Sequence, residues 1–490
     1  MKKLTLLASS IIAATIAGQA SACTTILVGN QATKDGSYIV ARNEDYQATN
    51  AKNFVFHPAE KPQKEAFHSN ANDFAYPAAK EALQYTSMSD FNTDGKSMGE
   101  VGFNSAGVGM SSTETIYNGA KALKVDPYVT KTGIGEDSIE NVILPRIHSA
   151  KEGVELLGKI IERQGASEGF GVAFVDNDGI WYLETGSGHQ WMAEKVPADK
   201  YFVSANQGRL QHYLPNNPNY LASPTLVSFA EQHGLYQAVK GQPFDFHAAY
   251  SQDTPNDITY NYPRVWTLQH MYTQGLKTKI DQGKTFPVFL KPTHKLTVAD
   301  VEQGLRNHYQ GTSHDPYANK NPKEPYRPVS VFRTQESHVL QVRPNLPKAI
   351  GEVEYMAYGM TSLSVYLPYY QGMTKVPHSI TLGTEQADDQ SANWKFRKLQ
   401  TLAMMDWNDF APIVQKAYQN FEQQTAQKQK EMEKQYLAIY KSEPKQAQAL
   451  INNFEQQTVT DALKLTDQLT NTLFTKLTHK VDMTYHFEGA

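Results

Sequence analysis

The sequence predicts an α+β protein, and three features of its pattern support this fold class. Short segments rich in β-branched and aromatic residues follow one another at tight turns through the first half of the chain, which is typical of antiparallel strands. Within that half, residues 150–164 place Val154, Leu157 and Ile161 on one face at helical spacing. From residue 391 onward Gln, Lys, Ala and Leu dominate, and the pattern becomes helical. Strands and long helices are therefore expected in separate parts of the chain.

The expected elements can be placed in order along the chain. Strands are expected at 24–29, 37–42, 53–57, 99–103 and 107–113, and then at 169–175, 179–185, 190–195 and 200–205. Helices are expected at 138–148, 150–164, 407–441 and 444–478. Residues 209–300 combine Pro- and Asn-rich loops with short helices, and Thr297 to Asp300 has the pattern of a capping box. Residues 311–328 are expected to form an exposed loop, and 329–370 to return to strands.

The composition is that of a folded globular protein. The chain has 490 residues, of which 40% are hydrophobic and 20% charged, so it can bury a large core. Its formal net charge of -4 argues against a nucleic-acid-binding protein, which would carry a basic surface. Beyond the N-terminal segment, no apolar run approaches the roughly 18 residues of a membrane-spanning helix. The sequence contains no zinc-binding HExxH, P-loop or dinucleotide-binding motif, and we predict no cofactor and no metal.

Residues 1–22 have the organisation of a secretory signal peptide. Lys2 and Lys3 form a positive start, the stretch from Leu4 to Ala17 is apolar, and Ala20-Ser21-Ala22 supplies the small residues of a cleavage site. Cleavage between Ala22 and Cys23 is expected, with export to the periplasm or the medium and no stable membrane insertion afterwards. The chain then divides into the removed segment 1–22, a catalytic region 23–390 and a helical segment 391–490 packed on it.

Cys23 is the only cysteine, and it directly follows the expected cleavage site. A lone thiol in an oxidising compartment is prone to oxidation and dimerisation, so its presence needs an explanation. It can be there by chance, or it can carry the acyl chains of a bacterial lipoprotein, although Ala20 replaces the Leu-like residue of that signal. The third interpretation is an N-terminal nucleophile. There the thiolate attacks, and the α-amine, with a pKa of about 8, serves as base.

The segment after Cys23 fits this third interpretation. Two β-rich stretches flank the turn at Asp35-Gly36, and the resulting hairpin returns Arg42 and Asp45 to the side of Cys23. An arginine near a thiol favours the thiolate, and a carboxylate can hold the α-ammonium group. An ordinary ion cluster at a strand end would have the same spacing.

Several motifs in this order resemble one family. They are CTTILVG at 23–29 with ARNED at 41–45, GFNSAG at 102–107 with GMSSTETI at 109–116, WYLETGSGHQW at 181–191, VSANQ at 203–207 and RVW at 264–266. Together they resemble bacterial dipeptidase A-type cysteine dipeptidases. These are N-terminal nucleophile hydrolases, distantly related to penicillin V acylase and bile salt hydrolase. The resemblance implies a four-layer αββα sandwich, here with a helical C-terminal extension.

The resemblance also implies roles for individual residues. Cys23 would be the nucleophile and, through its amine, the base, while Arg42 and Asp45 match the Arg-x-x-Asp of the superfamily. Asn206 would stabilise the oxyanion, although the sequence without the resemblance favours an asparagine that closes a turn. Arg264 matches a later arginine of the site. The second oxyanion donor would come from the segment at Thr113 and Glu114, through a backbone N–H.

The predicted activity is hydrolysis of dipeptides through a thioester intermediate, and the sequence leaves oligomerisation open. Two alternatives remain. One is an N-acyl amide hydrolase of the penicillin V acylase or bile salt hydrolase type, and the other is a lipid-anchored envelope protein acylated on Cys23. His189 and His212 could also pair with Cys23, but the papain-type signature is absent.

Overall fold

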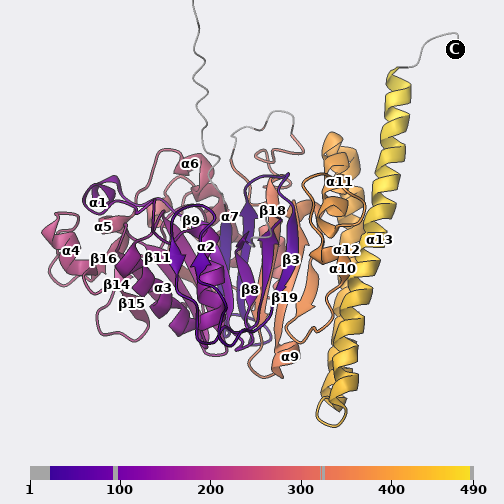
Figure 1. Cartoon of the computed structure of the whole chain (residues 1–490). Coiled ribbons are helices and arrows are strands. Elements are labelled where there is room, and N and C mark those ends of the chain that lie inside the picture. The colour runs from indigo at the N-terminus through magenta and orange to yellow at the C-terminus, as the bar shows by residue number, and fades with distance from the viewer. Residues whose placement is uncertain (1–22, 92–97, 320–321, 323–325, 486–490) are drawn as a thin grey trace, which may run out of the picture.

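Two antiparallel sheets organise the chain in the computed structural model, which describes residues 23–91, 98–319, 322 and 326–485 (Figure 1). The larger sheet has seven strands, in the order β17 (Phe289–Leu290), β13 (Tyr201–Ser204), β1 (Thr24–Val28), β2 (Tyr38–Asp45), β18 (Thr334–Val342), β19 (Glu352–Tyr358) and β20 (Leu367–Tyr370). The other has six strands, in the order β15 (Tyr220–Ala222), β12 (Trp191–Lys195), β11 (Gly179–Thr185), β10 (Phe170–Asp176), β9 (Gly109–Thr115) and β8 (Val101–Phe103).

The two sheets share a core because their strands alternate between two buried faces. Leu27 and Val40 of the larger sheet belong to the same apolar cluster as Ala173 and Val175 of the smaller one. The residues between these positions point the opposite way. Ile26 and Val28 meet α7 (Tyr262–Tyr272) and α8 (Val298–Leu305) through a second cluster. Val172 and Phe174 meet α2 (Glu136–Ile143) and α3 (Ala150–Gln164) through a third.

Shorter elements connect these layers. A three-stranded sheet contains β3 (Lys52–His57), β6 (Tyr85–Asp90) and β7 (Met98–Gly99), and two-stranded pairs form between β4 (Phe67–His68) and β5 (Ala75–Tyr76) and between β14 (His212–Tyr213) and β16 (Phe244–Asp245). The short helices are α1 (Ala120–Val125), α4 (Leu226–Gln232), α5 (Phe246–Tyr250), α6 (Asp257–Tyr260), α9 (Lys348–Gly351) and α10 (His378–Thr381).

Helices from the last part of the chain extend the core on one side. They are α11 (Ala392–Met405), α12 (Trp407–Ile439) and α13 (Pro444–Thr484). Phe396, Phe410 and Leu473 belong to the same apolar cluster as the inter-sheet residues. In Figure 1, α12 and α13 run side by side, and α13 extends well past the body.

These elements confirm the α+β class predicted from the sequence. The capping box at Thr297 is present, since Thr297 and Asp300 each accept from the backbone N–H of the other. The helix expected over 138–148 is shorter, because α2 ends at Ile143 and a 3-10 turn follows at Leu144–Arg146. Pro145 explains the change, since it has no N–H to continue the α-helical ladder.

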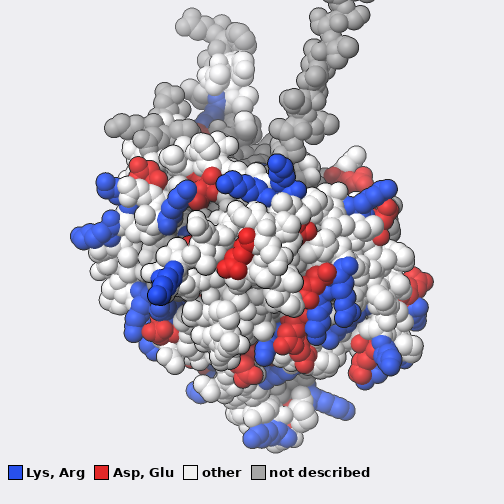
Figure 2. Space-filling model, turned by 90° about the vertical axis from the view of Figure 1, so that its left-hand side faces the viewer, with Lys and Arg blue, Asp and Glu red and all other residues white. Residues whose placement is uncertain are grey.

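Basic and acidic side chains intermingle on the face shown in Figure 2. Among the described residues, no helix combines the length and the apolar character needed to cross a bilayer. The expected signal peptide, residues 1–22, lies outside the described residues.

Candidate active site

The layer between the two sheets changes from apolar to polar at one end, and this end forms the candidate site. Alternate positions of a strand point to the same face, so the polar residues continue the apolar inter-sheet rows. Leu27 is followed by Thr25 and Cys23, Val40 by Arg42 and Glu44, Phe202 by Ser204 and Asn206, and Leu340 by His338 and Glu336. All eight polar members of these rows are buried. Thr25 pairs with Arg42 on one side and with Ser204 on the other, which brings the rows together.

Arg42 contacts the sulfur of Cys23. Its Nη1 donates to Sγ at 3.1 Å, and its Nη2 is bound to Glu100. Burial alone would lower the pKa of Arg42, but Cys23, Glu100 and Glu44 together raise it well above its usual value. The guanidinium therefore stays charged beside the thiol.

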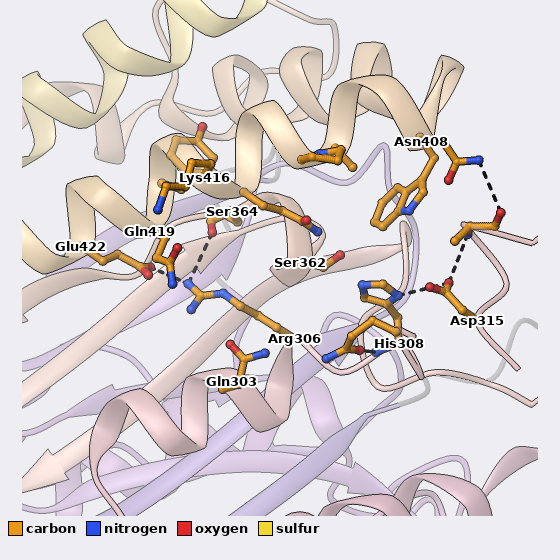
Figure 3. A pocket seen from close by; sticks show the side chains of 17 residues that line it. Gln303, Arg306, His308, Asp315, Ser362, Ser364, Asn408, Lys416, Gln419 and Glu422 are labelled. Atoms are coloured by element: carbon orange, nitrogen blue, oxygen red, sulfur yellow. Dashed lines mark hydrogen bonds and ion pairs between the residues drawn. The ribbon is translucent and has the colours of Figure 1, made fainter. Parts of the chain in front are cut away.

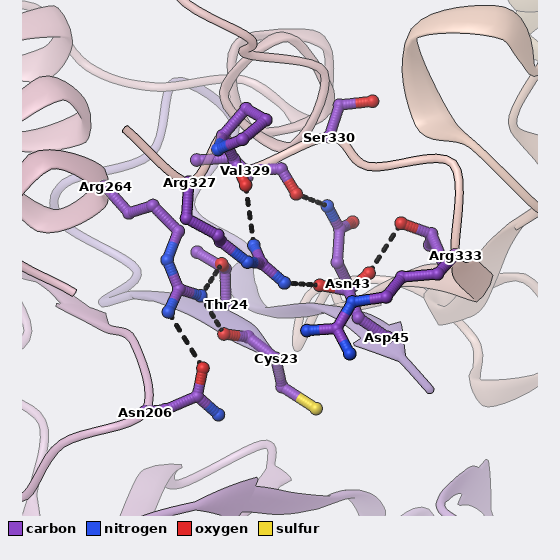
Figure 4. A network of polar contacts seen from close by, with 12 residues as sticks. Cys23, Thr24, Asn43, Asp45, Asn206, Arg264, Arg327, Val329, Ser330 and Arg333 are labelled. Atoms are coloured by element: carbon purple, nitrogen blue, oxygen red, sulfur yellow. Dashed lines mark hydrogen bonds and ion pairs between the residues drawn. The ribbon is translucent and has the colours of Figure 1, made fainter. Parts of the chain in front are cut away.

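Arg264 connects Cys23 to Asn206 (Figure 4). Its Nη1 donates to the backbone oxygen of Cys23 and, at 2.9 Å, to the hydroxyl of Thr24. Its Nη2 donates to Asn206 Oδ1 at 2.8 Å and to Asn261 Oδ1 at 2.6 Å. The Asn206 amide is thereby oriented, with its oxygen on the arginine and its Nδ2 directed to Thr115 O at 3.2 Å. Four predicted site residues, Cys23, Arg42, Asn206 and Arg264, thus form one network.

Asp45 lies at the end of β2, where two side chains from other segments bind it. Its carboxylate accepts from the guanidinium of Arg327 and, at 2.5 Å, from the hydroxyl of Thr334. Arg327 belongs to the segment 311–328, for which we predicted an exposed loop. That prediction is wrong at Arg327, because pairing with Asp45 allows its charge to be buried.

Thr113 and Glu114 lie in β9, and their side chains are outside the described part of the structure. The backbone register with β10 shifts here, since Gly171 pairs with Glu114 while Val172 pairs with Ser112. Thr113 is therefore the extra residue of a β-bulge. Bulges interrupt the ladder at the extra residue and are frequent next to active sites.

A buried charge cluster that the sequence did not predict lies beside Arg42. Lys52 contacts Glu44 and, at 2.8 Å, Asp90. Burial raises the pKa of Glu44 well above its usual value and that of Glu100 to about 8. These two carboxyls come from separate segments, and no spacing in the sequence indicates that they meet.

His338 is the buried histidine of this end of the sheets. Burial lowers its pKa and keeps the ring neutral, so Nδ1–H donates to Glu336 at 2.9 Å and Nε2 accepts from the Ser111 hydroxyl at 2.8 Å. The histidines considered from the sequence lie elsewhere. The ring of His189 is held by Asp126 at 2.7 Å, and His212 is exposed on β14.

A cavity of about 580 Å³ lies between α8 and α12, and Cys23 does not line it (Figure 3). Its lining includes the ion pair of Arg306 with Glu422 and the hydrogen bond between His308 and Asp315. Within the described parts of the chain, no group of three or more His, Cys, Asp or Glu side chains is arranged to hold a metal ion.

Comparison with known proteins identifies the family to which this site belongs. Residues 22–420 match the family described as peptidase family C69. The chain belongs to peptidase family C69. It is 66% identical over 357 residues to a probable dipeptidase of Salmonella dublin, covering 73% of this chain and 82% of the relative. It is 36% identical over 396 residues to probable dipeptidase A of Streptococcus pyogenes, with 79% and 84% covered.

A third C69 relative is dipeptidase A of Lactobacillus helveticus, 30% identical over 367 residues, with 73% of this chain and 77% of the relative covered. These matches confirm the resemblance predicted from the motifs, and they confirm that the chain is a cysteine peptidase. The matched residues, 22–420, include the seven- and six-stranded sheets and end within α12.

Proposed function

We propose that this protein is an exported dipeptidase whose nucleophile is Cys23, released as the N-terminal residue by cleavage after Ala22. The observation that carries the proposal is that Arg42 contacts the sulfur of Cys23, the only cysteine of the chain, while Arg264 joins the Cys23 backbone oxygen to Asn206. The names of the C69 relatives support dipeptides as substrates. The proposed reaction is an acyl transfer in two stages, acylation of the Cys23 thiol and hydrolysis of the resulting thioester.

In the first stage the sulfur attacks the scissile carbonyl carbon. The Arg42 guanidinium, 3.1 Å from Sγ, favours the thiolate over the thiol. The α-amine accepts the thiol proton, which it can do only after the peptide bond to Ala22 is broken, because an amide nitrogen is not a base. The carbonyl electrons move to oxygen, and a tetrahedral oxyanion forms.

The oxyanion is stabilised by donors that are in place before the reaction. An N–H of Asn206 is the proposed side-chain donor, and Arg264 fixes the amide by binding its oxygen. The bulge at Thr113 and Glu114 is the proposed source of the backbone donor. The α-ammonium then protonates the leaving amine, the C–N bond breaks, and water hydrolyses the thioester to free the thiol.

Asp45 is proposed to act at the same end of the sheet. Its bonds to Arg327 and Thr334 hold it rigidly, and an ionised carboxylate there favours an ammonium group on residue 23. Asp45→Asn tests this role, because it removes the carboxylate charge and keeps the acceptor oxygen for Thr334.

The fold and the division of the chain belong to the same proposal. Helices α2 and α3, the two facing sheets, and α7 and α8 support a four-layer αββα N-terminal nucleophile hydrolase fold. Residues 1–22 would be removed, 23–390 would form the catalytic region, and 391–490 would be a helical segment packed on it.

The experiment compares dipeptide hydrolysis by the chain starting at Cys23 with hydrolysis by the chain that keeps residues 1–22. Product amine is measured by chromatography, and Cys23→Ala in the short form is the matched control. We expect activity only in the short form and none in the Cys23→Ala variant. Equal activity in both forms would remove the α-amine from the mechanism. A chain that cleaves N-acyl amides but no dipeptides would be an acylase. An intact mass of the exported protein that includes acyl chains would indicate a lipoprotein.

A further inference from the structure

Arg333 lies at the same end of the larger sheet as Cys23. It directly precedes β18, whose first residue, Thr334, pairs with Asp45 at the end of β2. Strands β1 and β18 both run antiparallel to β2, so both begin at this end. Figure 4 shows the Arg333 guanidinium extending from the start of β18 toward the side of the network where the Cys23 thiol lies.

Tyr260 fixes the far end of the Arg333 side chain. The Nη2 of Arg333 donates to the Tyr260 hydroxyl at 2.8 Å. The Tyr260 ring in turn lies 5.1 Å from the Arg264 guanidinium carbon, measured to the ring centroid. Arg264 also binds the Cys23 carbonyl oxygen, so this one residue connects the Arg333–Tyr260 pair to the nucleophile.

The backbone on both sides of Arg333 is fixed by a buried residue of α11. Arg397 donates from Nη1 to Phe332 O and from Nη2 to Thr334 O, each at 2.6 Å. Burial lowers the pKa of Arg397 to about 10, still high enough for it to be charged at neutral pH. A half-buried arginine held at its backbone and at its tip loses little further freedom when it binds a ligand.

We propose that Arg333, positioned by Tyr260 and Arg397, binds the α-carboxylate of the substrate and so selects dipeptides over longer peptides and over amides. This inference rests on the proposed function. In a dipeptide, the carboxylate carbon lies at most about 4 Å from the scissile carbonyl carbon, across the C–N, N–Cα and Cα–C bonds. An anchor for it must therefore lie at the nucleophile's end of the larger sheet, which is where Arg333 lies. Guanidinium and carboxylate form charge-assisted pairs, whereas a peptide amide at the same place has no charge to offer.

The test uses Ala-Ala and its C-terminal amide, Ala-Ala-NH₂, as paired substrates for the chain with a free Cys23 amine. Loss of a charge-assisted pair typically corresponds to about 10- to 100-fold in affinity. We expect Arg333→Gln to lower kcat/KM for Ala-Ala by this factor, mainly through KM, and to leave kcat/KM for Ala-Ala-NH₂ within about threefold. Arg333→Lys should restore part of the preference for the free carboxylate. Arg163 is an exposed arginine of α3, and Arg163→Gln should leave kcat/KM for both substrates unchanged.

An equal loss for both substrates, or no loss for either, would overturn the assignment. Tyr260→Phe offers an independent variant if Arg333→Gln does not fold, because it removes only the hydroxyl that holds Nη2. It should reduce Ala-Ala hydrolysis about threefold to tenfold and spare the amide, and a uniform loss would count against the anchor. Failure of the proposed function is a separate outcome, since the unmutated chain would then cleave neither substrate.

Discussion

Replacing Asn206 by aspartate tests the oxyanion stabilisation most directly. In the structure the side-chain oxygen of Asn206 accepts from Arg264 at 2.8 Å, and Nδ2 faces Thr115 O at 3.2 Å. Asn206→Asp keeps an oxygen for Arg264 to bind, replaces the donor by an acceptor, and adds a negative charge that repels both the thiolate and the oxyanion. The arginine therefore retains its partner and Cys23 O retains the arginine, while the reacting carbonyl loses one N–H.

The expected magnitude follows from this single change. Loss of one oxyanion donor typically costs about 100- to 1000-fold in kcat, or roughly 3–4 kcal/mol of transition-state stabilisation. The bond to Thr115 O contributes about 1 kcal/mol to folding, and in the variant a carboxylate oxygen faces that carbonyl oxygen instead. The stronger charge-assisted bond to Arg264 offsets this loss in part, so the variant should melt below the unmutated protein and still fold.

The assay is single-turnover hydrolysis of a dipeptide, together with thermal unfolding of the same samples. Asn53→Asp is the matched control, because the Asn53 amide is half-buried on β3 and makes only a 3.4 Å bond to Thr381 O. That variant should keep full activity. A kcat for Asn206→Asp within about threefold of the unmutated enzyme would refute the assignment of Asn206, whatever its effect on stability.

Two further predictions concern stability. Burial raises the pKa of Glu100 to about 8, so the folded chain holds a proton there that the unfolded chain releases, and its stabilising contribution is lost as the pH rises toward 8. Glu100→Gln should therefore flatten the fall in unfolding free energy between about pH 5 and 8, measured by urea titration at each pH; an unchanged slope would contradict it. Gly158→Ala should destabilise by about 1–3 kcal/mol, because the added Cβ would lie 2.2 Å from Trp191 Cζ2. Helix propensity alone predicts the opposite sign, so a stabilised variant in thermal unfolding would exclude the clash, and Lys159→Ala on the exposed face is the neutral control.

Local sequence patterns predicted most of the elements correctly. The β-branched and aromatic segments between turns predicted β1, β2 and β9 to β13 to within a few residues of their observed bounds. The apolar stripe of residues 150–164 correctly predicted helix α3. The start of α12 at Trp407 was predicted, whereas α11 was not predicted as a separate helix, since the pattern is already helical from residue 391 up to Asp406, where the backbone leaves the helical region. The order of the strands could not be predicted from local patterns either, because β2 pairs with β18, which lies almost three hundred residues later in the chain.

The candidate site divides in the same way. Arg42 was accessible to sequence reasoning because a hairpin fixes its position relative to Cys23. Asn206 and Arg264 required the family resemblance, since their pairing joins a strand end to a helix far along the chain. Arg327, Glu100 and Arg333 gave no signal, because only the tertiary fold brings them to this end of the sheets.

The buried carboxyls explain how Arg42 can serve the thiol while surrounded by acidic residues. Ion pairs in a protein interior are costly, so this cluster is not explained by stability alone. Burial raises the pKa of both Glu44 and Glu100, so these carboxyls carry less negative charge beside Arg42 than exposed carboxylates would. A neutral carboxyl accepts a hydrogen bond from Arg42 and orients it without cancelling its charge. The positive charge of the guanidinium thus remains directed at Cys23 Sγ, where the reaction needs a thiolate.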